Sequence, residues 1–336
     1  MKTICFFNNK GGVGKTTLLC NLAAYLSIYH NKKILVVDAD PQCNSSAYLL
    51  PEDKLEEILF DEDKANNLDK FYEPIRSGRG ELTKPNITTS ERFKIDVIVG
   101  HPRLALTEDL LANDWSATKS VIERGFRTTF AMAELFDFNK EYDYILIDMG
   151  PSLGALNRSI LLCSDYFLMP LSVDIFSMMA VSNIHSSFEK WKRDIEKALS
   201  DYKNERGKDY SLVSNDLPIK WKLNFLGYVR QLYRAKSIEG VRQHVKAYER
   251  IITKQDEELE KMGKFFGFSS NELKNKKLGE IPTLSSVIPL SQQAHAPIFE
   301  LNNNDGIVGG HYSRVAEAKE FFEMISANFL RELGDI

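Results

Sequence analysis

Short runs of apolar residues recur along the whole chain. They occupy residues 3–7, 33–42, 95–100, 142–150, 164–171, 223–232 and 285–290. Within each run the apolar residues are largely continuous and do not alternate with polar ones. This pattern is typical of parallel strands that helices cover on both faces. We therefore interpret the runs as strands of one buried sheet.

The segments between the runs are long enough to form helices. In residues 16–30, apolar side chains recur at the spacing of one helix face, at Leu18, Leu22, Ala23 and Leu26. Strands that alternate with helices in this way predict an α/β fold. We expect a doubly wound, mostly parallel sheet of seven or eight strands with helices on both faces.

Three stretches interrupt the alternation, and we expect them to be insertions. Residues 51–94 are charged and contain the turn-rich sequence SGRGELTKPN. Residues 190–222 are strongly polar, and residues 254–283 carry the alternating charges of an exposed helical extension. The chain, residues 1–336, is therefore interpreted as a single domain with three insertions.

The composition is that of a globular protein. Hydrophobic residues make up 43% of the chain and charged residues 27%, and the net charge is −4. A protein with this charge needs a local basic patch to bind nucleic acid. The four cysteines are scattered without a CxxC pair, which argues against a disulfide framework or a zinc ribbon. Because no apolar run reaches the roughly 18 residues of a membrane span, we expect a cytoplasmic protein.

A glycine-rich loop lies between the first apolar run and the helix that follows. Its residues are Asn9, Lys10, Gly11, Gly12, Val13, Gly14, Lys15, Thr16 and Thr17. The glycines let successive N–H groups face a polyphosphate, and the helix adds its positive N-terminal end. Lys15 is expected to neutralise the β- and γ-phosphates, the Thr16 hydroxyl to complete a Mg²⁺ shell, and Thr17 to lie near the α-phosphate. The loop therefore predicts a P-loop NTPase.

Three aspartates end predicted strands, where this fold places its ligands. Asp38 and Asp40 end the second run, and Asp148 ends the run YDYILI. Acids at these positions hold Mg²⁺ or position the attacking water, although a strand-end aspartate also commonly caps the next helix. For Asp148 we favour the metal role, and Asp38 is a further candidate for holding Mg²⁺, although spacing alone does not distinguish Asp38 from Asp40.

Three segments in order, KGGVGKTT, DADPQCNSS and YDYILIDMGPSL, resemble the deviant Walker A ATPases of the ParA/MinD group. The resemblance to ParA-type partition ATPases is strongest. The later stretches LGYVRQLYR and SSVIPLSQQAHAPIFE resemble the closing strands and the nucleotide-base loop of that group. The resemblance therefore covers most of the chain outside the three expected insertions.

The resemblance implies an ATP-dependent homodimer with ATP and Mg²⁺ in each subunit. Lys10 takes the position of the lysine that reaches across to the partner's phosphates, and Asn9 replaces a glycine that this group does not require. By position, Asp40 orients the attacking water and Asp148 serves the Mg²⁺ side. Gly150 lies in the switch that moves when the γ-phosphate leaves. The base pocket is implied at Ile288, Pro289 and Leu290.

A row of basic residues is the candidate surface for DNA. Four of them recur every fourth residue and would form one helix row, with two more just ahead: Arg242, Lys246, Arg250, Lys254, Arg234 and Lys236. Such a row neutralises phosphates of a duplex without reading its sequence, but it is also typical of a solvated helix face. Membrane binding is not expected, because the apolar stripe of the C-terminal segment lies beside an acidic face.

Two functions are consistent with these features. The first is a ParA-like ATPase that dimerises with ATP, binds DNA nonspecifically, and hydrolyses ATP slowly under stimulation by a partner protein. It would segregate or position DNA or another large cargo, and would be nucleoid-associated if it binds DNA. The alternative is a nucleotide-switched interaction subunit that controls an effector without binding DNA, for example in a defence or regulatory system.

Overall fold

The computed structural model describes residues 1–60, 67–79, 81–212, 216–232, 241–282, 284 and 286–335, with only the backbone described at 232 and 241–247. Eight strands form one sheet in the order β3-β4-β2-β5-β1-β6-β7-β8. They are β1 Lys2–Phe6, β2 Ile34–Ala39, β3 Thr88–Ser90, β4 Ile95–Ile98, β5 Tyr144–Met149, β6 Tyr166–Ser172, β7 Asn224–Leu232 and β8 Lys277–Pro282. All neighbours are parallel except β3 and β4. The predicted mostly parallel sheet is confirmed.

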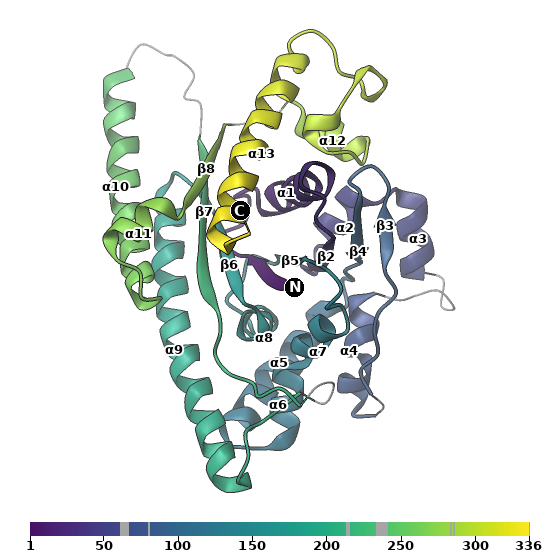
Figure 1. Ribbon diagram of the computed structural model, residues 1–336, viewed down its shortest axis with the longest axis vertical. Helices are drawn as coiled ribbons and strands as arrows, with labels where there is room; N and C mark the ends of the chain where they lie inside the picture. Colours follow the sequence, from purple (N-terminus) through teal and green to yellow (C-terminus); the bar gives the residue numbers. More distant parts are fainter. Residues whose placement is uncertain are drawn as a thin grey trace.

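Helices cover both faces of the sheet (Figure 1). Those of the first half are α1 Lys15–His30, α2 Asn44–Leu49, α3 Glu52–Phe60, α4 Leu68–Ser77, α5 Leu104–Lys119, α6 Glu123–Thr129 and α7 Ala131–Asp137. Those of the second half are α8 Ala155–Cys163, α9 Ile175–Arg206, α10 Val241–Phe265, α11 Ser270–Asn275, α12 Ile288–Gln293 and α13 His311–Leu333. Two short 3₁₀ turns, Ile298–Glu300 and Asn303–Asp305, precede α13.

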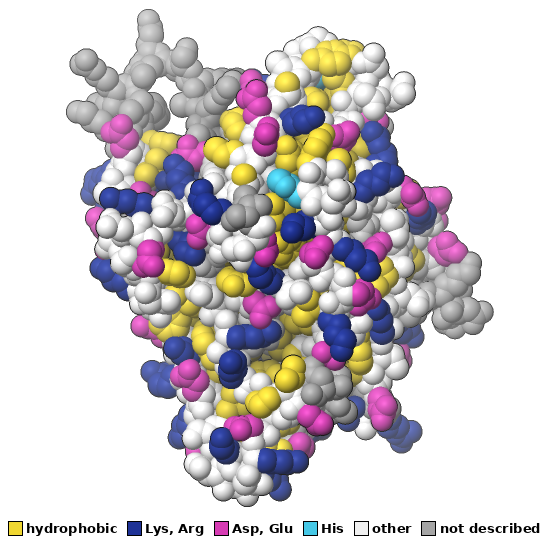
Figure 2. All heavy atoms as spheres, in the orientation of Figure 1, with side chains coloured by type: hydrophobic (Ala, Val, Ile, Leu, Met, Phe, Trp, Pro, Cys, Tyr) yellow, Lys and Arg dark blue, Asp and Glu magenta, His cyan; other side chains and the backbone are white. Residues whose placement is uncertain are grey.

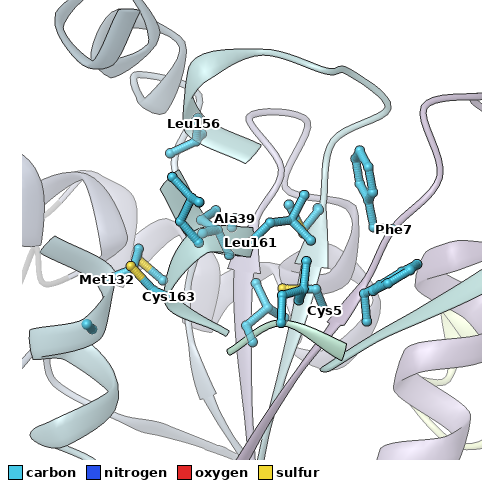
Figure 3. Close-up of a cluster of buried hydrophobic side chains, with 14 of the residues drawn as sticks. Cys5, Phe7, Ala39, Met132, Leu156, Leu161 and Cys163 are labelled. Carbon is cyan, nitrogen blue, oxygen red and sulfur yellow. The ribbon is translucent and has the colours of Figure 1, made fainter. Parts of the chain in front are cut away.

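Each face of the sheet carries its own hydrophobic core, and β1 contributes to both. Cys5 and Phe7 belong to the core under α5, α7, α8 and α9, whereas Ile4 and Phe6 belong to the core under α1 and α13. Figure 3 shows the first of these cores, where side chains of β1 and β2 meet those of α7 and α8. Because successive strand residues point to opposite faces, a strand buried on both faces has to be continuously apolar.

One predicted strand is wrong. Within residues 285–290 the structure forms no strand at its described positions, and α12 begins instead at Ile288. Pro289 lies in the first turn of this helix, where its missing N–H costs nothing, whereas in a strand it would remove a ladder hydrogen bond. The last strand of the sheet is β8, which falls inside the segment 254–283 that we expected to be an insertion.

The other expected insertions also contain regular structure. Residues 51–94 include α3, α4 and the antiparallel edge strand β3, and residues 190–222 begin with the second half of α9. That these segments are insertions in a single domain stays a prediction. The apolar stripe of the C-terminal segment packs into the core, since Phe322, Ile325 and Phe329 of α13 are buried. Among the described residues, no helix combines the length and apolarity that crossing a membrane requires.

Candidate functional site

The glycine loop and the strand-end aspartates meet at one edge of the sheet. β1, β2 and β5 are adjacent and parallel, so their carboxyl ends lie side by side. A cleft of about 430 Å³ opens there. It is lined by Gly11, Gly12, Gly14, Lys15, Thr16, Thr17, Asp40, Gln42, Asn44, Ala47, Tyr48, Pro151 and Gln292. Most of the predicted loop therefore faces the cleft, although Asn9, Lys10 and Val13 do not line it.

The backbone of the loop requires glycine at two positions. Gly12 and Gly14 both have φ of 72°, in the left-handed region that side chains disfavour. Gly14 also packs against Gln231 at the end of β7, because a Cβ added there would lie 1.7 Å from Gln231 Nε2. Together these two constraints fix the curve of the loop that leads into α1.

Lys15 and Thr16 begin α1 beside the acidic side chains. Lys15 is buried, and burial lowers its pKa against the opposing effect of Asp148 and Asp40. The Thr16 hydroxyl donates to Asp148 Oδ2 at 2.7 Å. The ammonium of Lys15 and the hydroxyl of Thr16 therefore both line the cleft beside the acids. Their contacts with phosphates and Mg²⁺ stay predictions.

The chemistry around Asp148 fits a magnesium ion. Its Oδ1 atom is buried and has no hydrogen-bond partner among the residues that the structure describes. Burial first, and then the nearby charge of Asp38, raise the pKa of Asp148 above its ordinary value. A cation with oxygen ligands relieves both penalties. Among the described residues, no group of three His, Cys, Asp or Glu side chains forms a metal site by itself, so Mg²⁺ would need phosphate or water oxygens as well.

The structure distinguishes the two acids that spacing did not. Asp38 is fully buried and its Oδ2 accepts hydrogen bonds from the backbone N–H and hydroxyl of Ser46, at 2.8 and 2.6 Å. Asp40 lines the cleft, and its Oδ1 accepts from the backbone N–H of Gln42 at 2.9 Å. Through these contacts Asp38 holds α2 against β2, whereas Asp40 faces the cleft. The metal role of Asp38 and the water-orienting role of Asp40 stay predictions.

Lys10 is held by the last residue of β6 and by a residue just after it, and it does not line the cleft. Its Nζ donates to Ser172 Oγ at 3.0 Å and forms an ion pair with Asp174. Burial acts to raise the pKa of Asp174, but the hydrogen bonds from Lys10 and Ser172 outweigh it and the pKa lies below its ordinary value. Asp174 also caps α9 by accepting from the N–H of Ser177. Sequence reasoning missed Asp174, although it follows a strand end as Asp40 does.

The segment around Gly150 is fastened by two side chains that sequence reasoning also missed. The amide of Asn157 donates to the carbonyl oxygens of Gly150 and Ser152, at 2.7 and 2.8 Å. Glu108 of α5 accepts from the first two N–H groups of α8, at Ala155 and Leu156. A carboxylate at a helix N-terminus is favourable for charge and hydrogen bonding alike. A Cβ at Gly150 would lie 3.3 Å from Asp40 Oδ1, which leaves little room between the two strand ends.

The far end of the cleft lies between α2 and α12. Tyr48 of α2 and Gln292 of α12 line it there. The Tyr48 hydroxyl is within 2.6 Å of Ser291 Oγ and accepts from the Asn21 amide at 3.1 Å, which joins α1, α2 and α12. The predicted base-pocket residues lie in the first turn of the same α12 but do not line the cleft; these are Ile288, Pro289 and Leu290. Their contact with a base stays a prediction.

The candidate DNA-binding residues are only partly described. Arg234 and Lys236 lie outside the described residues, and Arg242 and Lys246 fall where only the backbone of α10 is described. Arg250 and Lys254 are exposed on α10, and within the described part of the chain neither forms an ion pair.

Known proteins resemble this chain in sequence and in fold. The family described as an AAA domain (AAA_31) matches residues 1–200. The chromosome partitioning protein ParA of Myxococcus xanthus is 33% identical over 197 residues, which cover 58% of this chain and 60% of that protein. The chain spans between 52% and 62% of the length of several such curated relatives.

Two solved structures share the fold. Protein DIP2308 from Corynebacterium diphtheriae has a TM-score of 0.73 at 29% identity, and the match covers 99% of both chains. A putative plasmid partition protein from Borrelia burgdorferi, solved with bound AMPPNP, has a TM-score of 0.53 at 19% identity, and the match covers 98% of both chains. Because its matching model covers more than half of the residues, the chain belongs to the AAA domain family AAA_31, and over the matched part it is similar to partition proteins such as ParA and Soj.

Proposed function

We propose that the protein binds ATP with Mg²⁺ in the cleft at the end of β1, dimerises in that state, and hydrolyses the nucleotide. The observation that carries the proposal is the buried Lys15, which lines the cleft and interacts electrostatically with Asp40 and Asp148. It directly follows a loop in which two glycines adopt the left-handed conformation. A buried cation beside acids is suited to a ligand that brings both negative charge and a metal ion. The Borrelia relative with bound AMPPNP supports the choice of an adenine nucleotide.

The described side chains divide the chemistry among them. Lys15 would neutralise the transferring phosphoryl group, Thr16 and Asp148 would hold Mg²⁺, and Asp40 would orient the attacking water. Mg²⁺ would supply charge neutralisation at the phosphate oxygens. Asp40 is suited to its role because only one of its carboxylate oxygens, Oδ1, accepts from Gln42, while the side chain faces the cleft.

An exposed apolar patch beside the cleft supports dimerisation. It comprises Ile175, Phe176 and Met179 on the first two turns of α9, which are 57%, 72% and 51% exposed. The patch directly follows Asp174, the partner of Lys10. Large exposed apolar side chains that gather near a functional site are typical of interfaces. A second subunit that covers this patch would face Lys10, whose ammonium would then contact the partner's phosphates.

We propose that the dimer binds DNA through α10. DNA binding would associate the protein with the nucleoid. Arg250 and Lys254 are exposed and unpaired among the described residues, whereas Lys261 and Lys264 further along α10 pair with Glu258 and Glu260. On the face shown in Figure 2, Lys and Arg side chains are interspersed with Asp and Glu over the described residues. A DNA contact on α10 would therefore be local, with little sequence preference.

Binding of the purified protein to random-sequence duplex DNA tests the proposal. It is measured by gel shift with ATP, ADP or no nucleotide at two salt concentrations. We expect salt-sensitive binding with ATP alone, and its loss in a double variant, Arg250→Glu with Lys254→Glu. Lys119→Glu with Lys197→Glu is the matched control, because it changes the net charge equally at exposed positions elsewhere. ATP-dependent dimerisation without DNA binding in any state would favour the interaction subunit that controls an effector.

A further inference from the structure

Helix α10 is attached to the sheet by a buried polar contact. Gln255 is fully buried, and its Nε2 donates to the carbonyl oxygen of Ser172, at the end of β6, at 3.0 Å. Its Oε1 accepts from Arg230 Nε of β7 at 3.1 Å. Arg230 is 3% exposed and also donates to Asp256 Oδ1 at 2.6 Å. Two neighbouring residues of α10 are therefore bonded to the ends of two neighbouring strands.

Packing alone does not require a glutamine at this position. Elsewhere along its inner face α10 uses apolar side chains, Leu259 and Met262, which are buried. A buried amide is favourable only while all its partners are in place, so it fixes one arrangement of the helix against the strands. The position of α10 therefore depends on where the end of β6 lies.

The same residue at the end of β6 also holds Lys10. The Ser172 hydroxyl accepts from Lys10 Nζ at 3.0 Å and donates to Asp174 at 2.6 Å, while the Ser172 carbonyl accepts from Gln255. One residue thus joins the loop of the nucleotide site to α10. When Lys10 leaves to contact a nucleotide, Ser172 and Asp174 lose a positively charged partner. Asp174 caps α9, and α9 lies alongside α10 (Figure 1).

We propose that Gln255 is a positioning residue that transmits the state of Lys10 to α10, so that nucleotide binding changes how α10 is held on the sheet. The inference rests on the proposed function, because it needs a nucleotide that draws Lys10 away from Ser172. The proposed coupling would change the position of the surface of α10 that carries Arg250 and Lys254. Lys254 directly precedes Gln255, so movement of the buried anchor moves the exposed basic residues with it.

Hydrogen–deuterium exchange on the full chain, with and without AMPPNP and Mg²⁺, tests this without any DNA. The readout is the exchange rate of peptides from residues 248–265. In the wild type we expect the nucleotide to change this rate about threefold or more. Gln255→Glu should abolish that change, because the carboxylate still accepts from Arg230 but no longer donates to Ser172. Gln255→Leu, which removes both contacts, should behave in the same way.

Controls separate coupling from loss of the fold or of the site. Thr253→Ala alters an exposed hydroxyl on the same helix. Within the described part of the chain this hydroxyl donates only to the carbonyl oxygen of Glu249, one turn earlier in α10, so the variant should keep the wild-type response. All variants should bind AMPPNP with affinity within about twofold of the wild type. The inference is overturned if Gln255→Glu keeps the wild-type response, or if the wild type binds AMPPNP without any change in α10.

The outcomes also separate this inference from the proposed function. A nucleotide response in α10 that depends on Gln255, in a protein that does not bind DNA, would overturn the DNA function and leave the coupling intact. ATP-dependent DNA binding that Gln255→Glu leaves unchanged would overturn the coupling and leave the function intact. A wild type that binds no AMPPNP would overturn both.

Discussion

Lys10 and Asp174 form an ion pair that joins the glycine loop to the first turn of α9. Both side chains are about one third exposed, so the pair lies at the rim of the site. The ion pair therefore holds this lysine toward α9 of its own subunit. A lysine that serves a partner subunit has to break this contact first.

Asp174→Asn should therefore strengthen ATP-dependent dimerisation. Asparagine still accepts from the Ser177 N–H that Asp174 caps, but it removes the charge that retains Lys10. A partly exposed ion pair contributes up to about 1 kcal/mol, so we expect the dimer Kd at saturating ATP to fall by about fivefold. Sedimentation of the two proteins measures this. A weaker dimer in the variant would mean that the ion pair belongs to the dimeric state.

Lys15→Ala should abolish nucleotide binding. The change removes the ammonium that faces the phosphates and leaves Asp40 and Asp148 to repel them. Loss of one partner of a buried charge pair costs several kcal/mol, so ATP affinity should fall on the order of a hundredfold or more. Isothermal titration measures it, with the exposed Lys119→Ala as control. Retained affinity would remove Lys15 from the phosphate site.

Asp40→Ala should separate binding from hydrolysis. Asp40 faces the cleft without touching Lys15 or Thr16 in any hydrogen bond of the described residues, so ATP affinity should stay within a fewfold of the wild type. Turnover should drop about a hundredfold or more, which is the usual contribution of a group that positions or deprotonates water. Phosphate release measures the rate. Wild-type turnover would exclude Asp40 from the reaction.

Phe176→Ser should weaken the dimer without changing nucleotide binding by the monomer. The ring is 72% exposed, so its loss should cost the folded monomer little. If a second subunit buries the ring, the substitution should raise the dimer Kd roughly tenfold. Phe60→Ser is the matched control, because Phe60 is 78% exposed on α3. Equal effects of the two substitutions would show that the α9 patch is not the interface.

The ion pair between Arg92 and Asp305 should make stability depend on pH. Arg92 donates two hydrogen bonds to the Asp305 carboxylate, at 2.6 and 2.9 Å, and so holds the pKa of Asp305 below its ordinary value of 3.8. A depressed pKa stabilises the folded state above pH 3.8, and this contribution is lost as the pH falls through the folded-state pKa. Asp305→Asn should therefore cost about 0.5–1 kcal/mol near neutral pH.

Urea unfolding of the wild type and Asp305→Asn at several pH values tests this relation. The difference between the two should be constant from pH 7 to pH 5 and should narrow as the pH approaches 3.8 and below. A difference that is independent of pH would mean that the charge of Asp305 does not stabilise the loop before α13. The Asp305 side chain would then act through hydrogen bonds to the backbone, such as the one that it accepts from the Asn302 N–H.

The parts of the fold that are buried on both faces were predictable from the sequence. β1, β2 and β5 are short and largely apolar. β1 leads into the glycine loop, and β2 and β5 each contain an aspartate near their carboxyl end, so strand and site appear together in the sequence. β8 was not predictable in this way, because the run KLGEIP is half polar and its inner residues are covered by α13. The apolar run that includes Ile288 is typical of a strand, but Pro289 favours the first turn of a helix, and the structure forms α12 there.

The candidate site was predictable where one short segment supplies both the backbone and the side chains. Lys15, Thr16 and the glycines come from such a segment. Apart from Asn157, whose partners are close in the sequence, the groups that were missed depend on contacts between distant segments. Asp174 meets Lys10 across 164 residues, and Gln255 meets Ser172 across 83. Nothing in the local pattern of either segment identifies its partner, since these pairs arise only when the ends of the strands are brought together.

The central position of β1 has a consequence for how the protein is made. β1 pairs with β5 and β6, whose residues lie 140 or more positions later, so Lys2 and Ile4 find their partners at Tyr144 and Tyr166. At ribosomal rates of about 5–20 residues per second, the glycine loop stays without its supporting strands for roughly ten to thirty seconds of synthesis. A nascent chain should therefore gain ATP affinity late and abruptly, once β6 has left the ribosome, and chaperones have that interval in which to bind the exposed apolar strand.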